Sequence, residues 1–105
     1  MRLGAKQELF ALLISQHILW LYTNGYKVRV GHAMRCRNCV VGRKTSLHKE
    51  KLAEDLNLFK DGKFLQATED HRISGEKWES RHELCSWGGR FQDGNHYSLK
   101  HNGRR

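Results

Sequence analysis

The sequence predicts a small α+β domain in which an antiparallel sheet is flanked by helices. Three observations support this prediction: one long apolar segment near the N-terminus, later stretches that read as short strands, and no regular alternation of strands with helices. A chain of 105 residues can bury one hydrophobic core, so we expect residues 1–105 to form a single domain.

The first element is a helix over residues 5–22. Its apolar run from Leu9 to Tyr22 is too short to span a bilayer comfortably and is interrupted by polar residues. We therefore predict a buried helix and no stable membrane insertion. Gly25 follows as a left-handed cap. With no export signal of its own, the protein is expected to be made in the cytoplasm.

Residues 26–33 alternate between apolar and polar and predict a strand, whereas residues 34–45 are basic and irregular, as in a long loop. A second strand is expected over residues 55–59. The Asp61-Gly62 pair that follows is a strong hairpin signal and predicts a short returning strand.

The C-terminal third predicts mixed structure. Residues 69–82 read as a helix or helical turns that carry Ile73 and Trp78 inward. Glycine turns then lead to a final strand over residues 96–99.

Charge and cysteine content limit the function. Lys and Arg number 19 against 11 Asp and Glu, a formal charge of +8, which favours a polyanionic partner such as nucleic acid, an anionic membrane face or the acidic bacterial wall. Three cysteines are an odd number, which argues against a complete disulfide framework and for a reducing compartment or metal binding.

A histidine and acid set forms the candidate site. His48 and Asp55 are seven residues apart, which is about 10 Å along a helix and more than about 20 Å along a strand, so the chain between them must fold back if they share a metal. His96 is the candidate third ligand. Two histidines and one carboxylate, with a fourth position open, is the ligand count of a catalytic zinc site.

Asp93 precedes His96 across the Gly94-Asn95 turn pair, so both side chains can face one cavity. Zinc lowers the pKa of bound water to about 7, and Asp93 would accept the proton as that water attacks an amide carbonyl. The developing oxyanion needs further positive charge, for which Arg35 is the candidate; its guanidinium could also hold a substrate carboxylate.

The segments "SLHKEKLAEDLNLF" and "WGGRFQDGNHYSL" resemble the zinc peptidases of bacterial cell-wall metabolism, the D-Ala-D-Ala carboxypeptidase and L-alanyl-D-glutamate endopeptidase family, and in particular its phage and prophage endolysins. That family has Ser-x-His, a glycine three residues later, Ala-x-Asp, and further on an acid-x-x-His or acid-x-Trp-His. The matching residues are Ser46, His48, Ala53, Asp55, Asp93 and His96, and "GHAMR" places Arg35 at the family's substrate arginine. Lys51 stands where the family has glycine.

The resemblance implies a hedgehog/DD-peptidase-like fold and a monomer that binds one catalytic Zn²⁺ through His48, Asp55 and His96. Asp93 would be the general base, and Arg35 and Ser46 would contact a peptidoglycan stem peptide. Such an endolysin would wait in the cytoplasm and act on the wall after the membrane is permeabilised. The bond cleaved, L-Ala-D-Glu or D-Ala-D-Ala, stays open.

Two further features have alternative interpretations. Trp87 is either a wall of the substrate groove or an aromatic plug in a glycine turn. A second, structural zinc site could combine Cys36 and Cys39 with His82 and Cys85, since these are two pairs of soft ligands; the alternative is three unrelated thiols or a labile disulfide between Cys36 and Cys39.

The competing function is a non-catalytic, basic zinc-binding module that binds nucleic acid. The sequence contains no helix-turn-helix or aromatic nucleic-acid motif, and this function would leave the histidine and acid set unexplained. We therefore predict a zinc peptidase with no nucleic-acid partner.

Overall fold

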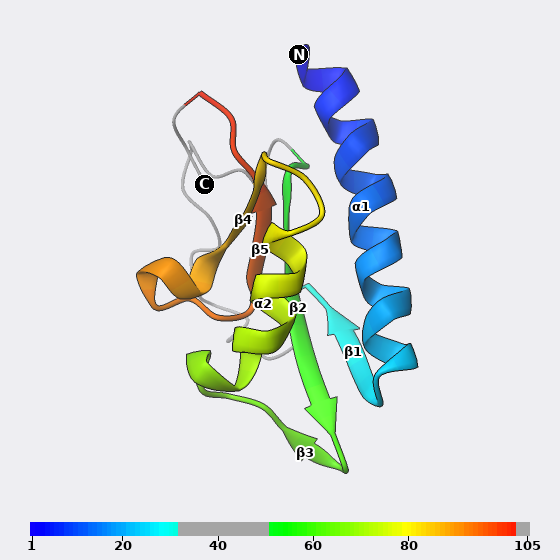
Figure 1. Cartoon of the computed structure of the whole chain (residues 1–105), viewed down its shortest axis with the longest axis vertical. Coiled ribbons are helices and arrows are strands. Elements are labelled where there is room, and N and C mark those ends of the chain that lie inside the picture. The colour runs from blue at the N-terminus through cyan, green and yellow to red at the C-terminus, as the bar shows by residue number, and fades with distance from the viewer. Residues whose placement is uncertain (32–50, 103–105) are drawn as a thin grey trace, which may run out of the picture.

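A computed structural model describes residues 1–31 and 51–102 (Figure 1). In this part of the chain, two helices and a five-strand antiparallel open sheet form a small α+β domain, which confirms the predicted class. The helices and strands are α1 (Leu3–Thr23), β1 (Tyr26–Val30), β2 (Ala53–Lys60), β3 (Lys63–Phe64), α2 (Arg72–Glu79), β4 (Cys85–Trp87) and β5 (His96–Leu99), with 3₁₀ turns η1 (Thr68–His71) and η2 (Gly88–Phe91).

Strand β2 organises the sheet, whose order is β1-β2-β5-β4 with β3 paired to β2 as a hairpin. The first part of β2, residues 53–55, pairs with β5, and the second part, residues 56–60, pairs with β1. The strand therefore changes partner between Asp55 and Leu56.

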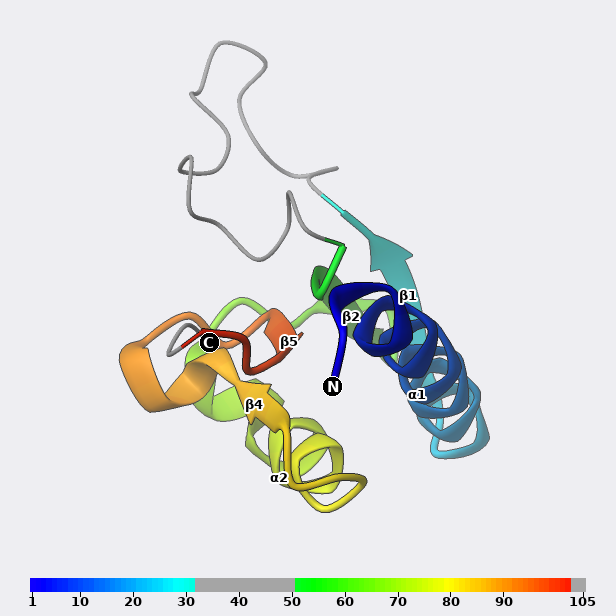
Figure 2. The same cartoon turned by 90° about the horizontal axis from the view of Figure 1, so that it is seen from above.

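The two faces of β2 differ because successive side chains of a strand point to opposite sides. Leu56 and Leu58 are fully buried and join Tyr97 of β5 in the hydrophobic core. Both helices pack on this side of the sheet (Figures 1 and 2). Asp55 and Asn57 occupy the other face and are also buried. The acidic residue beside the core leucines thus lies on the opposite face from them.

Within the described residues, most predicted elements are confirmed at their expected positions, whereas the predicted loop over residues 34–45 lies outside them. Gly25 has a φ of 88°, as expected for a residue in the left-handed conformation just after the C-terminus of a helix. In the hairpin turn, φ is 53° at Asp61 and 76° at Gly62. One prediction is wrong: Trp78 is buried, but Ile73 is 63% exposed. Five residues of helix separate them by about 140° around the axis, so one face cannot bury both.

Strand β4 was not expected from the sequence, which indicated only glycine turns after Ser86. A strand of three residues is too short to show an alternation of apolar and polar residues, and the two glycines that follow it indicate a turn instead. Its pairing with β5 is what sets it, with Trp87 opposite Tyr97.

A chain of polar groups crosses the core between the helices. The Nε of Arg81 donates to Nδ1 of His17 at 3.0 Å, so the proton of this imidazole lies on Nε2, which is 2.9 Å from Oγ of Ser74. Ser74 in turn lies 2.9 Å from the hydroxyl of Tyr97. His17 is therefore a neutral imidazole that donates to Ser74.

The far end of this chain is His71. Its Nε2 is 2.9 Å from the carbonyl oxygen of Leu65, which can only accept, so this nitrogen carries the proton. Nδ1 then accepts from the Tyr97 hydroxyl at 3.3 Å. In this series of polar groups, every hydrogen bond is donated in the direction from Arg81 toward Leu65. The imidazoles of His17 and His71 are both neutral.

Acid is expected to destabilise the protein through His17. Burial, with the charges of Arg81 and Lys77, lowers the pKa of His17 from 6.5 to about 3. Because the unfolded chain binds this proton more readily, the contribution is complete above pH 6.5 and is lost as the pH falls from 6.5 toward 3. Between pH 7.5 and pH 5 the loss amounts to about 2 kcal/mol.

Urea unfolding at the two pH values measures this loss, and His17→Gln should remove it from the pH dependence. If wild type and His17→Gln lose the same stability between pH 7.5 and pH 5, His17 is not the titrating group.

Candidate functional site

Asp55 and His96 lie side by side. They are directly opposite each other in the β2–β5 ladder, and Oδ1 of Asp55 is 3.8 Å from Nδ1 of His96. Asp55 is 1% exposed and His96 is 7% exposed. Two residues that are forty-one positions apart in the sequence are thus brought to one buried spot by strand pairing alone.

The backbone fixes Asp55 from both sides. Its carbonyl oxygen accepts from the amide of Gly31 at 2.8 Å, and the next amide, that of Leu56, donates to the carbonyl oxygen of Asn95 at 2.8 Å. The strand is therefore hydrogen-bonded on both edges at Asp55, which fixes the backbone from which this side chain extends.

Asp93 belongs to a tight loop that leads into β5. Its amide donates to the carbonyl oxygen of Gly88 at 2.8 Å, and its own carbonyl oxygen accepts from the amide of His96 at 3.1 Å. Gly88 is needed for this approach, because a Cβ there would lie 2.1 Å from the Asp93 carbonyl oxygen. The predicted turn across Gly94 and Asn95 thus does connect the predicted base to the predicted ligand.

Trp87 packs beneath this loop and is hydrogen-bonded to it. The indole Nε1 donates to the carbonyl oxygen of Gly94 at 2.7 Å, and the ring packs against Gly75 and Gly89, where any Cβ would come within 2.3 Å of it. With 3% of its surface exposed, Trp87 is the aromatic plug rather than an open wall. Its predicted contact with substrate has no support in this arrangement, and it is better described as a positioning residue.

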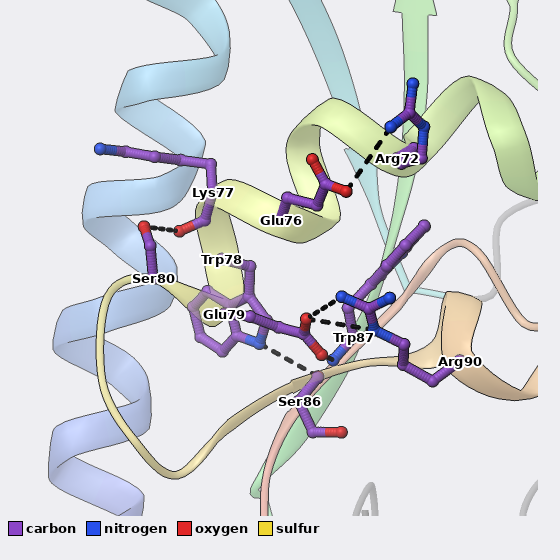
Figure 3. A network of polar contacts seen from close by, with 9 residues as sticks. All are labelled: Arg72, Glu76, Lys77, Trp78, Glu79, Ser80, Ser86, Trp87 and Arg90. Carbon is purple, nitrogen blue, oxygen red and sulfur yellow. Dashed lines mark hydrogen bonds and ion pairs between the residues drawn. The ribbon is translucent and has the colours of Figure 1, made fainter.

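Glu79 ties the same region to α2 (Figure 3). One carboxylate oxygen accepts from the amide of Trp87 at 3.2 Å, and the other accepts from Nη2 of Arg90 at 2.7 Å. Trp78 adds a hydrogen bond from its indole to the carbonyl oxygen of Ser86 at 3.1 Å. Helix α2 is thereby fixed to β4 and to the turn that precedes Asp93.

A polar cavity of about 290 Å³ opens beside Asp93. Asn57, His71 and Asn95 are among the residues that line it. The sequence predicted a cavity faced by both Asp93 and His96, and of these two residues only Asp93 is among those that line this one. One signal could have indicated part of it: Asn57 is two residues after Asp55 on a strand and therefore shares its face.

The donor chemistry of Asp55 and His96 fits zinc, which takes imidazole nitrogen and carboxylate oxygen as ligands. Within residues 1–31 and 51–102, no cluster of three or more His, Cys, Asp or Glu side chains could hold a metal ion. The predicted third ligand, His48, lies outside the described residues, as do Arg35 and Ser46. Two of the three predicted ligands are therefore adjacent, and the roles of the other three residues stay predictions.

Lys51 adopts the backbone conformation that the glycine of the family pattern would favour. Its φ is 59°, in the left-handed region, immediately before the buried Leu52 and strand β2. A non-glycine residue pays about 1–2 kcal/mol for this conformation. The positive φ expected at this position is therefore present, although the residue is lysine.

Two ligands of the predicted second zinc site lie in the described ranges. The thiol of Cys85 is part of the hydrophobic core, where burial raises its pKa to about 12. His82 uses Nδ1 to accept from the amide of Leu84 at 3.1 Å. Cys36 and Cys39 lie outside the described residues, so the four-ligand site stays a prediction.

Neither helix in the described ranges is long and apolar enough to cross a membrane. The resemblance to the wall peptidases rests on the residues themselves, because comparison of the chain with protein-family models, with curated proteins and with solved structures found no match.

Proposed function

We propose that this protein is a zinc-dependent peptidase that hydrolyses peptidoglycan stem peptides. The observation that supports it most is the buried cross-strand pair of Asp55 and His96, joined through a short turn to Asp93. Burying an acid is costly unless it is paired, and a carboxylate facing an imidazole supplies two of the ligands that a catalytic zinc site uses. The hedgehog/DD-peptidase-like fold is part of this proposal.

In the proposed site, His48, Asp55 and His96 hold the metal, which when bound would act as a Lewis acid toward water and the amide carbonyl. Asp93 lies at the rim of the polar cavity and takes the proton from the attacking water. Arg35 and Ser46 bind the peptide. The rigid sheet keeps Asp55 and His96 in place, so little reorganisation is needed during the reaction.

The biological setting that fits best is lysis of a bacterial host by a phage or prophage endolysin, acting as a monomer on the wall once the membrane is permeabilised. The net charge of +8 would draw such an enzyme to the anionic wall. A stem-peptide bond of the L-Ala-D-Glu or D-Ala-D-Ala type is the proposed target.

Digestion of purified peptidoglycan tests the proposal. We expect zinc-loaded protein to release new amino groups, a chelator to abolish the release, and added Zn²⁺ to restore it. Mass spectrometry of the fragments identifies the bond, and a metal count should give one zinc per chain.

Intact hydrolysis in the fully metal-free protein would remove the zinc mechanism. No hydrolysis together with tight, salt-sensitive binding to DNA would replace the peptidase with a nucleic-acid-binding module.

A further inference from the structure

The cavity beside Asp93 has a fixed hydrogen-bonding character. It is formed where the turn before β5 meets the segment around η1, with Gln66, Thr68 and His71 on one side and Asp93 and Asn95 on the other. No lysine or arginine of the described ranges lines it, although the chain as a whole is strongly basic. The described lining of the cavity therefore carries no positively charged side chain, in contrast to the basic composition of the protein.

The orientation of Asn95 follows from a backbone group. Nδ2 of Asn57 donates to the carbonyl oxygen of Gly31 at 3.0 Å, and since that carbonyl can only accept, Oδ1 of Asn57 is the oxygen that faces Asn95. Nδ2 of Asn95 donates to it at 3.1 Å. Oδ1 of Asn95, which takes part in neither of these bonds, is then an acceptor for a ligand in the cavity, and the second hydrogen of Nδ2 is a further donor.

His71 contributes no donor to the cavity. Its Nε2 proton goes to the carbonyl oxygen of Leu65 and its Nδ1 accepts from Tyr97, so both ring nitrogens are used. Burial lowers the pKa of His71, which agrees with a neutral ring. The described lining thus contains one carboxylate, that of Asp93, which only accepts, and a second acceptor in Oδ1 of Asn95.

We propose that this cavity binds a hydrogen-bond-donating nitrogen group of the substrate, a primary amide or an ammonium, and discriminates against a carboxylate. A donor satisfies the acceptors of Asp93 and Asn95, whereas a carboxylate would meet the negative charge of Asp93 with no lysine or arginine among the described lining residues. The cavity volume of about 290 Å³ is sufficient for one side chain. The inference rests on the proposed function, since it assigns the group to the peptide cleaved beside Asp93.

Three matched peptides test the selectivity. They differ in one side chain, which ends in a carboxamide, an ammonium or a carboxylate, and this residue is placed in turn on either side of the cleaved bond. With zinc-loaded protein we expect kcat/KM to be at least about tenfold higher for the two nitrogen groups than for the carboxylate at one position. The same order is expected for the Kd of uncleavable, N-methylated versions, and the difference between amide and ammonium identifies which group is natural.

A charge variant sharpens the test. Gln66→Lys places a cation in the lining and should shift the preference toward the carboxylate by about tenfold, which corresponds to about 1.4 kcal/mol. Gln16→Lys makes the same change on the exposed surface of α1 and should leave the preference as in wild type.

The outcomes separate the two proposals. Hydrolysis with equal or better use of the carboxylate peptide overturns the donor-selective cavity but keeps the peptidase. Selective binding of the nitrogen peptides without hydrolysis overturns the peptidase and keeps the cavity.

Discussion

Asp93→Asn is expected to lower the rate of wall-peptide hydrolysis by about a hundredfold to ten-thousandfold, the usual contribution of a general base. Asparagine has the shape of aspartate, and both hydrogen bonds that hold Asp93 in its loop come from the backbone, to Gly88 and from His96. The loop should therefore keep its conformation while the proton acceptor is lost. Zinc content should stay at one per chain, since Asp93 is not a proposed ligand.

Two comparisons make this result specific. Asp70→Asn removes an equal charge from an exposed position of η1 and should leave the rate unchanged. Asp55→Asn should lose zinc and activity together, because it removes a ligand. Hydrolysis by Asp93→Asn at the wild-type rate would show that another group accepts the proton.

Gly75→Ala is expected to destabilise the fold by about 3 kcal/mol or more. The new Cβ would lie 2.0 Å from Cδ2 of Trp87, far inside van der Waals contact. Neither partner can easily move, because Gly75 is part of the backbone of α2 and the indole is held by its hydrogen bond to Gly94. Overpacking at such rigid sites reaches the upper end of its usual cost.

Gly4→Ala is the matched control. It also changes a helical glycine to alanine, but no atom lies within 4 Å of the new Cβ. Alanine is the better helix former, so this variant should be unchanged or about 0.5 kcal/mol more stable. Urea unfolding measures both variants, and a Gly75→Ala protein as stable as Gly4→Ala would mean that Trp87 does not pack as described.

The sequence predicted the parts of the fold that have a local signal. Helix α1, the Asp61-Gly62 hairpin and strand β5 each follow from residues within a few positions of one another. The pairing of β2 with both β1 and β5 depends on contacts between distant segments, which no local pattern encodes. Strand β4 was missed for the same reason, since three residues become a strand only through their partner.

The candidate site divides in the same way. Spacing and residue type identified Asp55, Asp93 and His96, and the structure brings the first and last of these together and connects them to the second. The orientation of the Asn95 side chain could not be predicted, because it depends on a contact with Asn57, which is 38 positions away in the sequence. The burial of Trp87 and its hydrogen bond to Gly94 appear only in three dimensions, and its role in a substrate site stays a prediction.

The amide of Gly31 donates a hydrogen bond to the carbonyl oxygen of Asp55. This bond holds the end of the β1 segment against β2 at the position of Asp55. Changes in the length of the segment between Gly31 and His48 would therefore not displace Asp55, and each doubling of such a segment costs only about 0.6 kcal/mol. An insertion of one residue between Asp93 and His96 would instead break the turn in which the amide of His96 donates to the carbonyl oxygen of Asp93, and would move Asp93 relative to β5. Homologous proteins should tolerate insertions and deletions in the first segment and none in the second.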